Sequence, residues 1–176
     1  MLLLGSSALV LLAAAALTVN GVSGAQRGFA SGAPVEGSGS CELKPDRQDQ
    51  VEALMAEGAI IVYERNGGGS CIDELFSIDP VGRIVGDNGA TQIEKQITPA
   101  EVEQLVAAIE AKGWFTDEMY STSHVPCGQC YTYFLTVYSK GEEKTVKAVD
   151  GGTDAPADYW QVVSAINGVI PKFDAP

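Results

Sequence analysis

Histidine is almost absent from this chain, since His124 is the only one in 176 residues. A single histidine excludes metal centres built from several imidazoles and leaves a histidine-dependent catalytic triad with one candidate residue. The sequence also lacks a G-x-S-x-G nucleophile elbow, a phosphate-cradling glycine loop and a His-Glu-x-x-His helix. The usual anchors of hydrolases, kinases and dinucleotide-dependent enzymes are missing, so we expect a protein without catalytic residues, metal or cofactor.

Basic side chains are scarce as well. The chain has 11 Lys and Arg against 23 Asp and Glu, which gives a net charge of −12. Such a charge repels phosphate backbones and anionic lipid headgroups, so we expect no nucleic acid partner and no direct binding to anionic lipids. The simpler alternative is that the acidity only keeps the protein soluble.

No charged residue precedes Arg27, and residues 8–19 are almost purely apolar. A run of about 12 residues has the length of a signal-peptide core and is shorter than the ~20 residues of a membrane-spanning helix. Ser23 and Ala25 fit the small-residue pattern of a cleavage site after Ala25. We therefore expect export to a periplasm, a lumen or the extracellular space. Because residues 1–7 lack Lys and Arg, the alternative is an uncleaved anchor formed by residues 1–25.

Composition divides the rest of the chain into two parts. Residues 26–40 are rich in Gly, Ser and Ala and read as a flexible tether, and a short polar helix is expected within residues 45–56. We therefore predict a tether over residues 26–57 and a single folded domain over residues 58–176.

The domain has strand, turn and helix signals in two rounds. In the first round, residues 60–63, 75–78 and 84–85 are β-rich, and Asp79-Pro80-Val81-Gly82 is a tight-turn sequence. Thr98, Pro99 and Glu101 then start a helix with a capping box, and Gly113 ends it before Trp114 and Phe115, which we expect to plug the core.

The second round follows the same order. Residues 131–138 alternate as a strand, residues 139–142 turn the chain, residues 145–149 return it, and a helix follows Pro156. The sum is an α+β domain, in which an antiparallel sheet of about four to five strands is covered on one face by two helices. Its order is strand-strand-helix, repeated twice.

The cysteines Cys41, Cys71, Cys127 and Cys130 form an even set in an exported protein, which predicts disulfides. The preferred pairing is Cys41 with Cys71 and Cys127 with Cys130, and the spacing leaves the other pairings open. Two alternatives remain: redox chemistry at the Cys-x-x-Cys pair, and a zinc site that adds His124 and Cys71.

Several short segments carry a resemblance to a known family. They are Tyr63-Glu64-Arg65-Asn66-Gly67-Gly68, Ile97-Thr98-Pro99-Ala100-Glu101, Gly113-Trp114-Phe115 and Tyr131-Thr132-Tyr133. Over about residues 60–170 the chain resembles small bacterial proteins related to emfourin, an inhibitor of the thermolysin-like protease protealysin. It is equally similar to uncharacterised domains of exported bacterial proteins.

The resemblance implies a binding module that acts on a protein partner, such as a metalloprotease, by filling its cleft with a loop. The candidate binding residues are Arg65, Asn66, Gly67, Gly68, Gly69 and Ser70. Three consecutive glycines count against this role, because a floppy loop loses more entropy on docking, and a plain hairpin connection is the competing interpretation. The alternative function is a structural, envelope-associated domain or an accessory subunit of a membrane complex.

Overall fold

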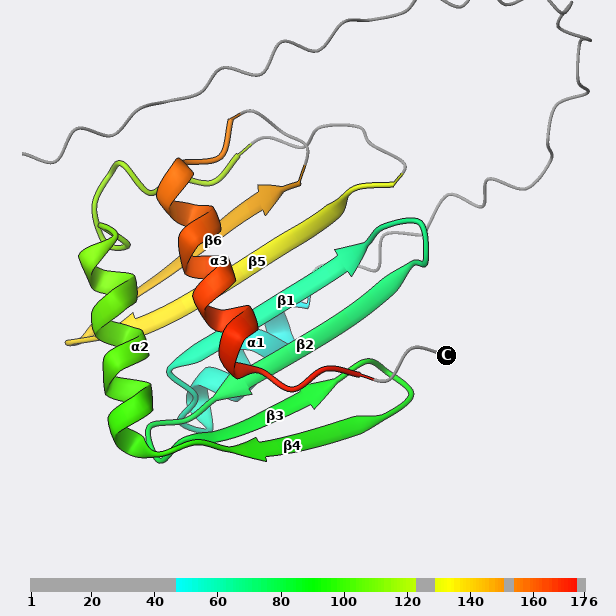
Figure 1. The fold of residues 1–176 in the computed structure, drawn as a ribbon, viewed down its shortest axis with the longest axis horizontal. Helices are drawn as coiled ribbons and strands as arrows, with labels where there is room; N and C mark the ends of the chain where they lie inside the picture. Colours follow the sequence, from blue (N-terminus) through cyan, green and yellow to red (C-terminus); the bar gives the residue numbers. More distant parts are fainter. Residues whose placement is uncertain (1–46, 123–128, 151–153, 174–176) are drawn as a thin grey trace, which may run out of the picture. The chain divides into compact units, whose positions relative to one another are not determined.

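The computed structural model describes residues 47–122, 129–150 and 154–173, all of which belong to one compact unit, residues 39–176. The described chain contains three α-helices and six β-strands (Figure 1). In chain order they are α1 (Gln48–Ala56), β1 (Ile61–Gly67), β2 (Ile72–Ile78), β3 (Arg83–Asp87), β4 (Gln92–Gln96), α2 (Pro99–Ala111), β5 (Tyr131–Ser139), β6 (Glu142–Val149) and α3 (Ala157–Val169).

The strands form one antiparallel sheet in the order β4-β3-β2-β1-β5-β6. β1 lies at the centre, where Tyr63 is opposite Phe76 of β2 and Leu135 of β5. Because neighbours across a ladder point to the same face, this register gathers the large apolar side chains of β1, β2 and β5 on one face of the sheet.

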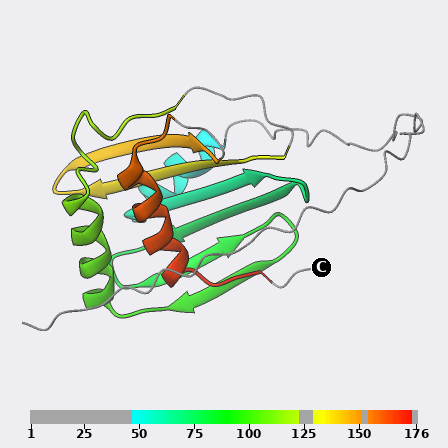
Figure 2. The ribbon, with the colours of Figure 1, turned by 45° about the horizontal axis from the view of Figure 1, so that its top comes forward.

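Helices α2 and α3 cover this apolar face. Their buried residues include Leu105 and Ile109 of α2 and Val163 and Ile166 of α3, which pack with the sheet in one core. Figures 1 and 2 show both helices crossing the strands, while the turn between β1 and β2 extends beyond them. That end of the sheet is therefore left uncovered by α2 and α3.

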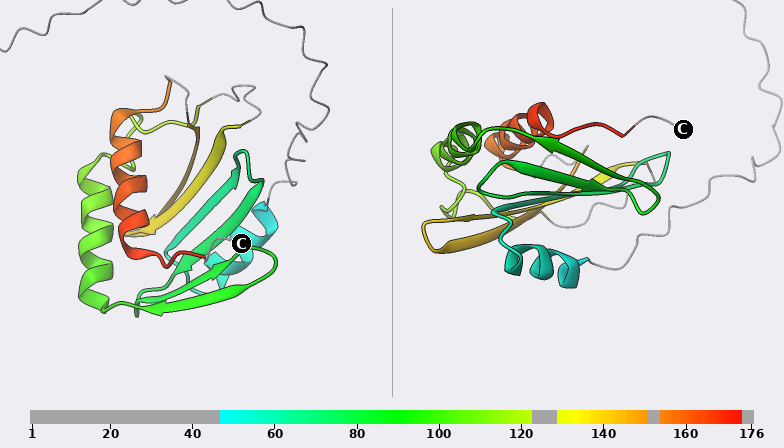
Figure 3. Two further views of the ribbon diagram at one scale, coloured as in Figure 1. Left: turned by 45° about the vertical axis from the view of Figure 1, so that its right-hand side comes forward. Right: turned by 90° about the horizontal axis from the view of Figure 1, so that it is seen from below.

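Helix α1 lies on the opposite face of the sheet, as the right-hand view of Figure 3 shows. Its apolar residues Val51, Leu54 and Met55 pack against the side chains of Val62 and Leu75 on β1 and β2. At its start Arg47 forms an ion pair with Asp73 of β2, with a distance of 2.5 Å, and both side chains are largely buried. The short helix expected within residues 45–56 is thus present and is packed on the sheet.

The capping box predicted for α2 is confirmed. The Thr98 hydroxyl accepts a hydrogen bond from the Glu101 backbone N–H at 3.2 Å, and the Thr98 backbone N–H donates to the Glu101 carboxylate at 2.7 Å. Gly113 takes the positive φ of 69° expected after the helix, and Trp114 is fully buried in the core as predicted. The tight turn is also present, since the Gly82 backbone N–H donates to the Asp79 carbonyl at 3.1 Å.

The expected number of strands and the expected repeat are wrong in detail. The α+β class and the antiparallel sheet are confirmed, but the sheet has six strands rather than four to five. The additional edge strand, β4, has only Ile93 packed against the core among polar residues, so its sequence carries no strand periodicity. Four strands therefore precede α2, while two precede α3, and the order is not a repeated strand-strand-helix.

The β6 edge of the sheet is covered by the segment that follows α2. The Thr122 backbone N–H donates to the Lys147 carbonyl at 2.9 Å, and the Ser121 hydroxyl accepts from the Lys147 backbone N–H at 3.0 Å. The Trp114 indole N–H points at the Lys144 carbonyl at 3.4 Å. These contacts occupy backbone groups that an edge strand otherwise presents to other chains.

Within the described residues, no helix has both the length and the apolar character needed to cross a membrane. Residues 1–46, which include the apolar run of residues 8–19, lie outside the described part of the chain.

Candidate functional site

The connection between β1 and β2 is a tight turn held by backbone hydrogen bonds. Gly67 and Gly68 adopt positive φ values of 95° and 71°, and Cys71 has a φ of 50°. The Gly68 backbone N–H donates to the Cys130 carbonyl at 3.0 Å, and the Cys71 backbone N–H donates to the Gly68 carbonyl at 3.1 Å. The turn is therefore bonded both to itself and to the residue that precedes β5.

Two of the three glycines are required by their surroundings. A Cβ atom at Gly67 would lie 2.7 Å from the Cys130 carbonyl oxygen, and one at Gly68 would lie 2.1 Å from the Tyr131 ring. A Cβ atom at Gly69 would meet nothing within 4 Å. Only Gly69, Ser70 and Cys71 are exposed, and these three residues are called the hairpin tip below.

The cysteines that the structure describes are both oxidised. Cys71 and Cys130 are disulfide-bonded, and the described residues include no free cysteine. The preferred pairing remains a prediction, because Cys41 and Cys127 lie in the undescribed part of the chain, as does His124 of the zinc alternative. Among the described residues, no group of three or more His, Cys, Asp or Glu side chains is placed to hold a metal ion.

Arg65 is the predicted binding residue with the richest surroundings. Its Nε and Nη2 atoms donate to Oε2 of Glu74 at 3.1 and 2.6 Å, and its guanidinium carbon lies 5.5 Å from the centre of the Tyr131 ring. Burial lowers the pKa of the guanidinium, but the hydrogen bond and the charge of Glu74 outweigh burial and raise it overall. The half-buried side chain is thus held in place as a permanent cation.

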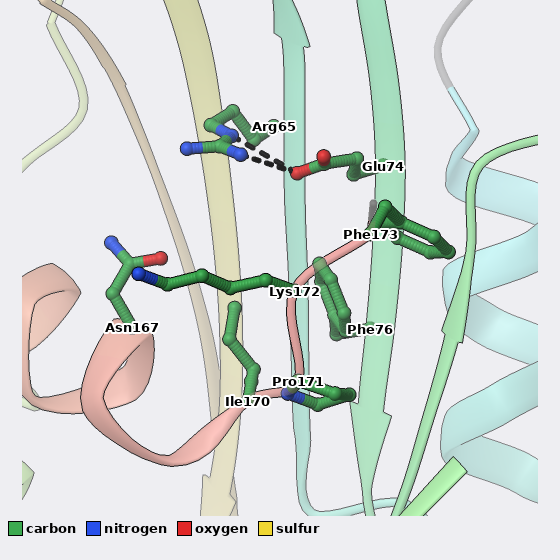
Figure 4. Close-up of a pocket in the computed structure, with 8 residues that line it drawn as sticks. All are labelled: Arg65, Glu74, Phe76, Asn167, Ile170, Pro171, Lys172 and Phe173. Atoms are coloured by element: carbon green, nitrogen blue, oxygen red, sulfur yellow. Dashed lines mark hydrogen bonds and ion pairs between the residues drawn. The ribbon is translucent and has the colours of Figure 1, made fainter. Parts of the chain in front are cut away.

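Arg65 and Glu74 form one wall of a cavity of about 420 Å³, which we call the C-terminal cavity (Figure 4). The other wall is the end of α3 and the segment after it, so strand residues and residues about a hundred positions later in the chain face one another. A volume of this size lies within the range of small-ligand sites. The lining residues are Arg65, Glu74, Phe76, Asn167, Ile170, Pro171, Lys172 and Phe173.

Two tyrosines near the C-terminal cavity have raised pKa values. Burial raises the pKa of Tyr63 to about 12, and its hydroxyl donates a long hydrogen bond of 3.4 Å to Oδ1 of Asn167. Burial also raises the pKa of Tyr133, with a further contribution from the charge of Asp150. Both phenols therefore stay neutral at physiological pH, and Tyr63 orients the Asn167 amide at the cavity wall.

The structure separates the six predicted binding residues into four environments. Arg65 lies on the wall of the C-terminal cavity, and Gly69 and Ser70 lie at the hairpin tip. Gly67 and Gly68 are buried turn residues. Asn66 is buried on the face that carries α1, where its Nδ2 donates to Glu64 at 2.8 Å.

The cavity itself was not predicted from the sequence. Asn167, Lys172 and Phe173 follow or end a helix whose pattern only indicated core packing, and Phe76 is an ordinary apolar strand residue. No motif joins these positions. The only available signal was Arg65, a cation inside an otherwise β-rich strand.

Comparison with known proteins gives no relative. No family model matches the chain, and no curated protein matches it. The resemblance to emfourin-related proteins therefore stays a prediction.

Proposed function

We propose that this chain is an exported, non-catalytic binding module and that the hairpin tip is the part that enters its partner. The observation that carries the proposal is the fixed turn between β1 and β2, which extends beyond α2 and α3 (Figure 2). Such a projection fits a concave surface on another protein better than a flat one.

The turn supports this role because little entropy remains to be lost there. The positive φ angles of Gly67 and Gly68, the bond to Cys130 and the disulfide at Cys71 fix both ends of the tip. A loop that is already ordered loses less freedom on docking than a flexible one. The loop is therefore expected to be ordered in spite of its three consecutive glycines.

The partner class comes from the resemblance to emfourin-related proteins. A thermolysin-like metalloprotease has a cleft that a narrow tip can occlude, and a tip with pinned ends resists cleavage because its backbone cannot adopt the extended form that a protease needs. The net charge of −12 adds long-range attraction to a partner with a basic rim.

The test titrates the full chain, purified after export, into a thermolysin-like peptidase assay. Gly69→Gln adds a side chain at the tip in open space, and Gly168→Gln is the matched control, since a Cβ there also meets nothing within 4 Å. We expect inhibition by the wild type and the Gly168 variant, and at least a tenfold weaker inhibition by the Gly69 variant. Unchanged peptidase rates at micromolar protein would remove the inhibitor proposal.

A second candidate is an envelope-associated domain or an accessory subunit of a membrane complex, held by an uncleaved residue 1–25 segment. It is favoured by the missing Lys and Arg in residues 1–7. N-terminal sequencing of the fractionated protein distinguishes the two, because a mature protein that begins at Gln26 is incompatible with the anchor.

A further inference from the structure

We propose that the C-terminal cavity binds a carboxylate that is attached to an apolar group. The inference rests on the lining of the cavity alone and does not depend on the hairpin tip or on protease inhibition. Its two requirements are an apolar floor for the body of the ligand and a positively charged rim for its anionic end.

The floor consists of aromatic and aliphatic side chains. The rings of Phe76 and Phe173 pack with their centres 5.5 Å apart, and Ile170 and Pro171 complete the surface. Phe76 and Ile170 belong to the core, so the floor is held rigidly by the fold. An aromatic or branched aliphatic group can bury its surface there without a polar atom left unpaired beneath it.

The rim carries two cations and one carboxylate. Arg65 and Glu74 form the ion pair already described, and Lys172 is exposed and makes no hydrogen bond or ion pair with any residue in the described ranges. The rim therefore has one net positive charge on a chain that is otherwise strongly acidic. A single positive charge fits a monoanion such as a carboxylate better than a dianionic phosphate.

The donors of the rim are oriented in advance. The Arg65 guanidinium has five N–H groups, of which Glu74 accepts two through one carboxylate oxygen, and the hydroxyl of Tyr133 also hydrogen-bonds with the Arg65 side chain, so N–H groups remain for a ligand. Oδ1 of Asn167 accepts from Tyr63, which turns the amide so that Nδ2 can donate elsewhere. Figure 4 shows the Lys172 side chain extending toward Asn167. Arginine, amide and ammonium donors are the groups that proteins use for carboxylates.

This ligand chemistry has two sources: a free apolar acid, and the C-terminal residue of a peptide. The probes are N-acetyl-L-phenylalanine and the peptide N-acetyl-Ala-Ala-Phe, each beside its own C-terminal amide. Titrations of the full chain, purified after export, are followed by amide NMR shifts. Equal binding of both acids assigns the site to free acids, and tighter binding of the peptide acid assigns it to peptide ends; either result supports the proposal.

The variants test the rim without disturbing the fold. Lys172→Gln removes the exposed cation of the cavity, and Lys112→Gln is its control, because Lys112 is partly exposed and pairs with Asp158 of α3 away from the cavity. We expect each acid to bind at least tenfold more tightly than its amide, and Lys172→Gln to weaken acid binding about fivefold or more. Failure of millimolar acid to bind, equal binding of acid and amide, or equal effects of the two lysine variants would overturn the proposal.

Discussion

The fixed turn between β1 and β2 can be tested with two neighbouring glycines. Gly68 has a φ of 71° and has the Tyr131 ring where a side chain would begin, whereas Gly69 faces open space. Gly68→Ala and Gly69→Ala therefore make the same chemical change one residue apart. If the turn is held as described, only the first change should be costly.

The expected sizes follow from the local geometry. For Gly68→Ala, a left-handed backbone costs an L-residue about 1–2 kcal/mol. The new methyl group would lie 2.1 Å from the ring, so Tyr131 must also move, which costs about 1–3 kcal/mol as overpacking. Moving the ring disturbs its contact with Arg65 as well. We expect a loss of about 2–5 kcal/mol in the free energy of unfolding for Gly68→Ala.

Gly69→Ala should behave differently. Its methyl group meets no atom within 4 Å, and alanine reduces the freedom of the unfolded chain. We expect the variant to match the wild type or to gain up to about 1 kcal/mol.

The assay is urea unfolding with the disulfides intact, followed by tryptophan fluorescence, to which the buried Trp114 and the partly buried Trp160 contribute. The slope of the transition should be the same for the wild type and both variants. Similar small effects at the two positions would refute the account, because they would mean that Tyr131 yields freely and that the turn is not held by its packing.

Three further predictions concern the rest of the fold. Thr98→Ala removes the capping hydroxyl of α2 and should lower the free energy of unfolding by about 1 kcal/mol in the same urea assay. Gly86→Ala would place a methyl group 2.5 Å from the Phe76 ring and should cost about 1–3 kcal/mol, with a loss of near-ultraviolet circular dichroism from the displaced aromatic side chain. An unfolded tyrosine has a pKa near 10, whereas the pKa of Tyr63 in the folded protein is about 12. Between these two pH values the unfolded state has released more protons than the folded state. The free energy of unfolding should therefore fall by on the order of 2 kcal/mol as the pH rises through this range. Tyr63→Phe should reduce this alkaline loss in urea titrations at about pH 9 and pH 11, and an unchanged loss would contradict it.

Local sequence signals predicted those parts of the fold that local chemistry controls. The capping box at Thr98, the turn that ends at Gly82 and the apolar face of α2 depend on neighbours within a few residues. β4 was missed because an edge strand needs little burial, here only the partly buried Ile93, and the ladder to β3 supplies the rest of its stabilisation.

The candidate site also depends on contacts between residues far apart in the chain, which local sequence signals do not predict. Arg65 became a candidate through the resemblance to emfourin-related proteins, but the chain gives no sign that Lys172 and Phe173 will face it. That meeting depends on the path of α3 across the sheet and on where the helix ends. Asn66 was placed in the binding loop, although the alternation of side chains along β1 turns it to the opposite face. The strand was predicted over residues 60–63 only, whereas β1 continues to Gly67 and therefore includes Asn66.

The contacts that Ser121 and Thr122 make along β6 have a consequence for self-association. A six-stranded sheet has two edges at which a strand from another molecule could be added, and here the protein's own chain engages one of them at Lys147 of β6. A strand added along β6 would have to displace Ser121 and Thr122 from Lys147, which disfavours pairing at that edge. Open-ended growth by edge pairing uses both edges of the sheet, so these two contacts work against it.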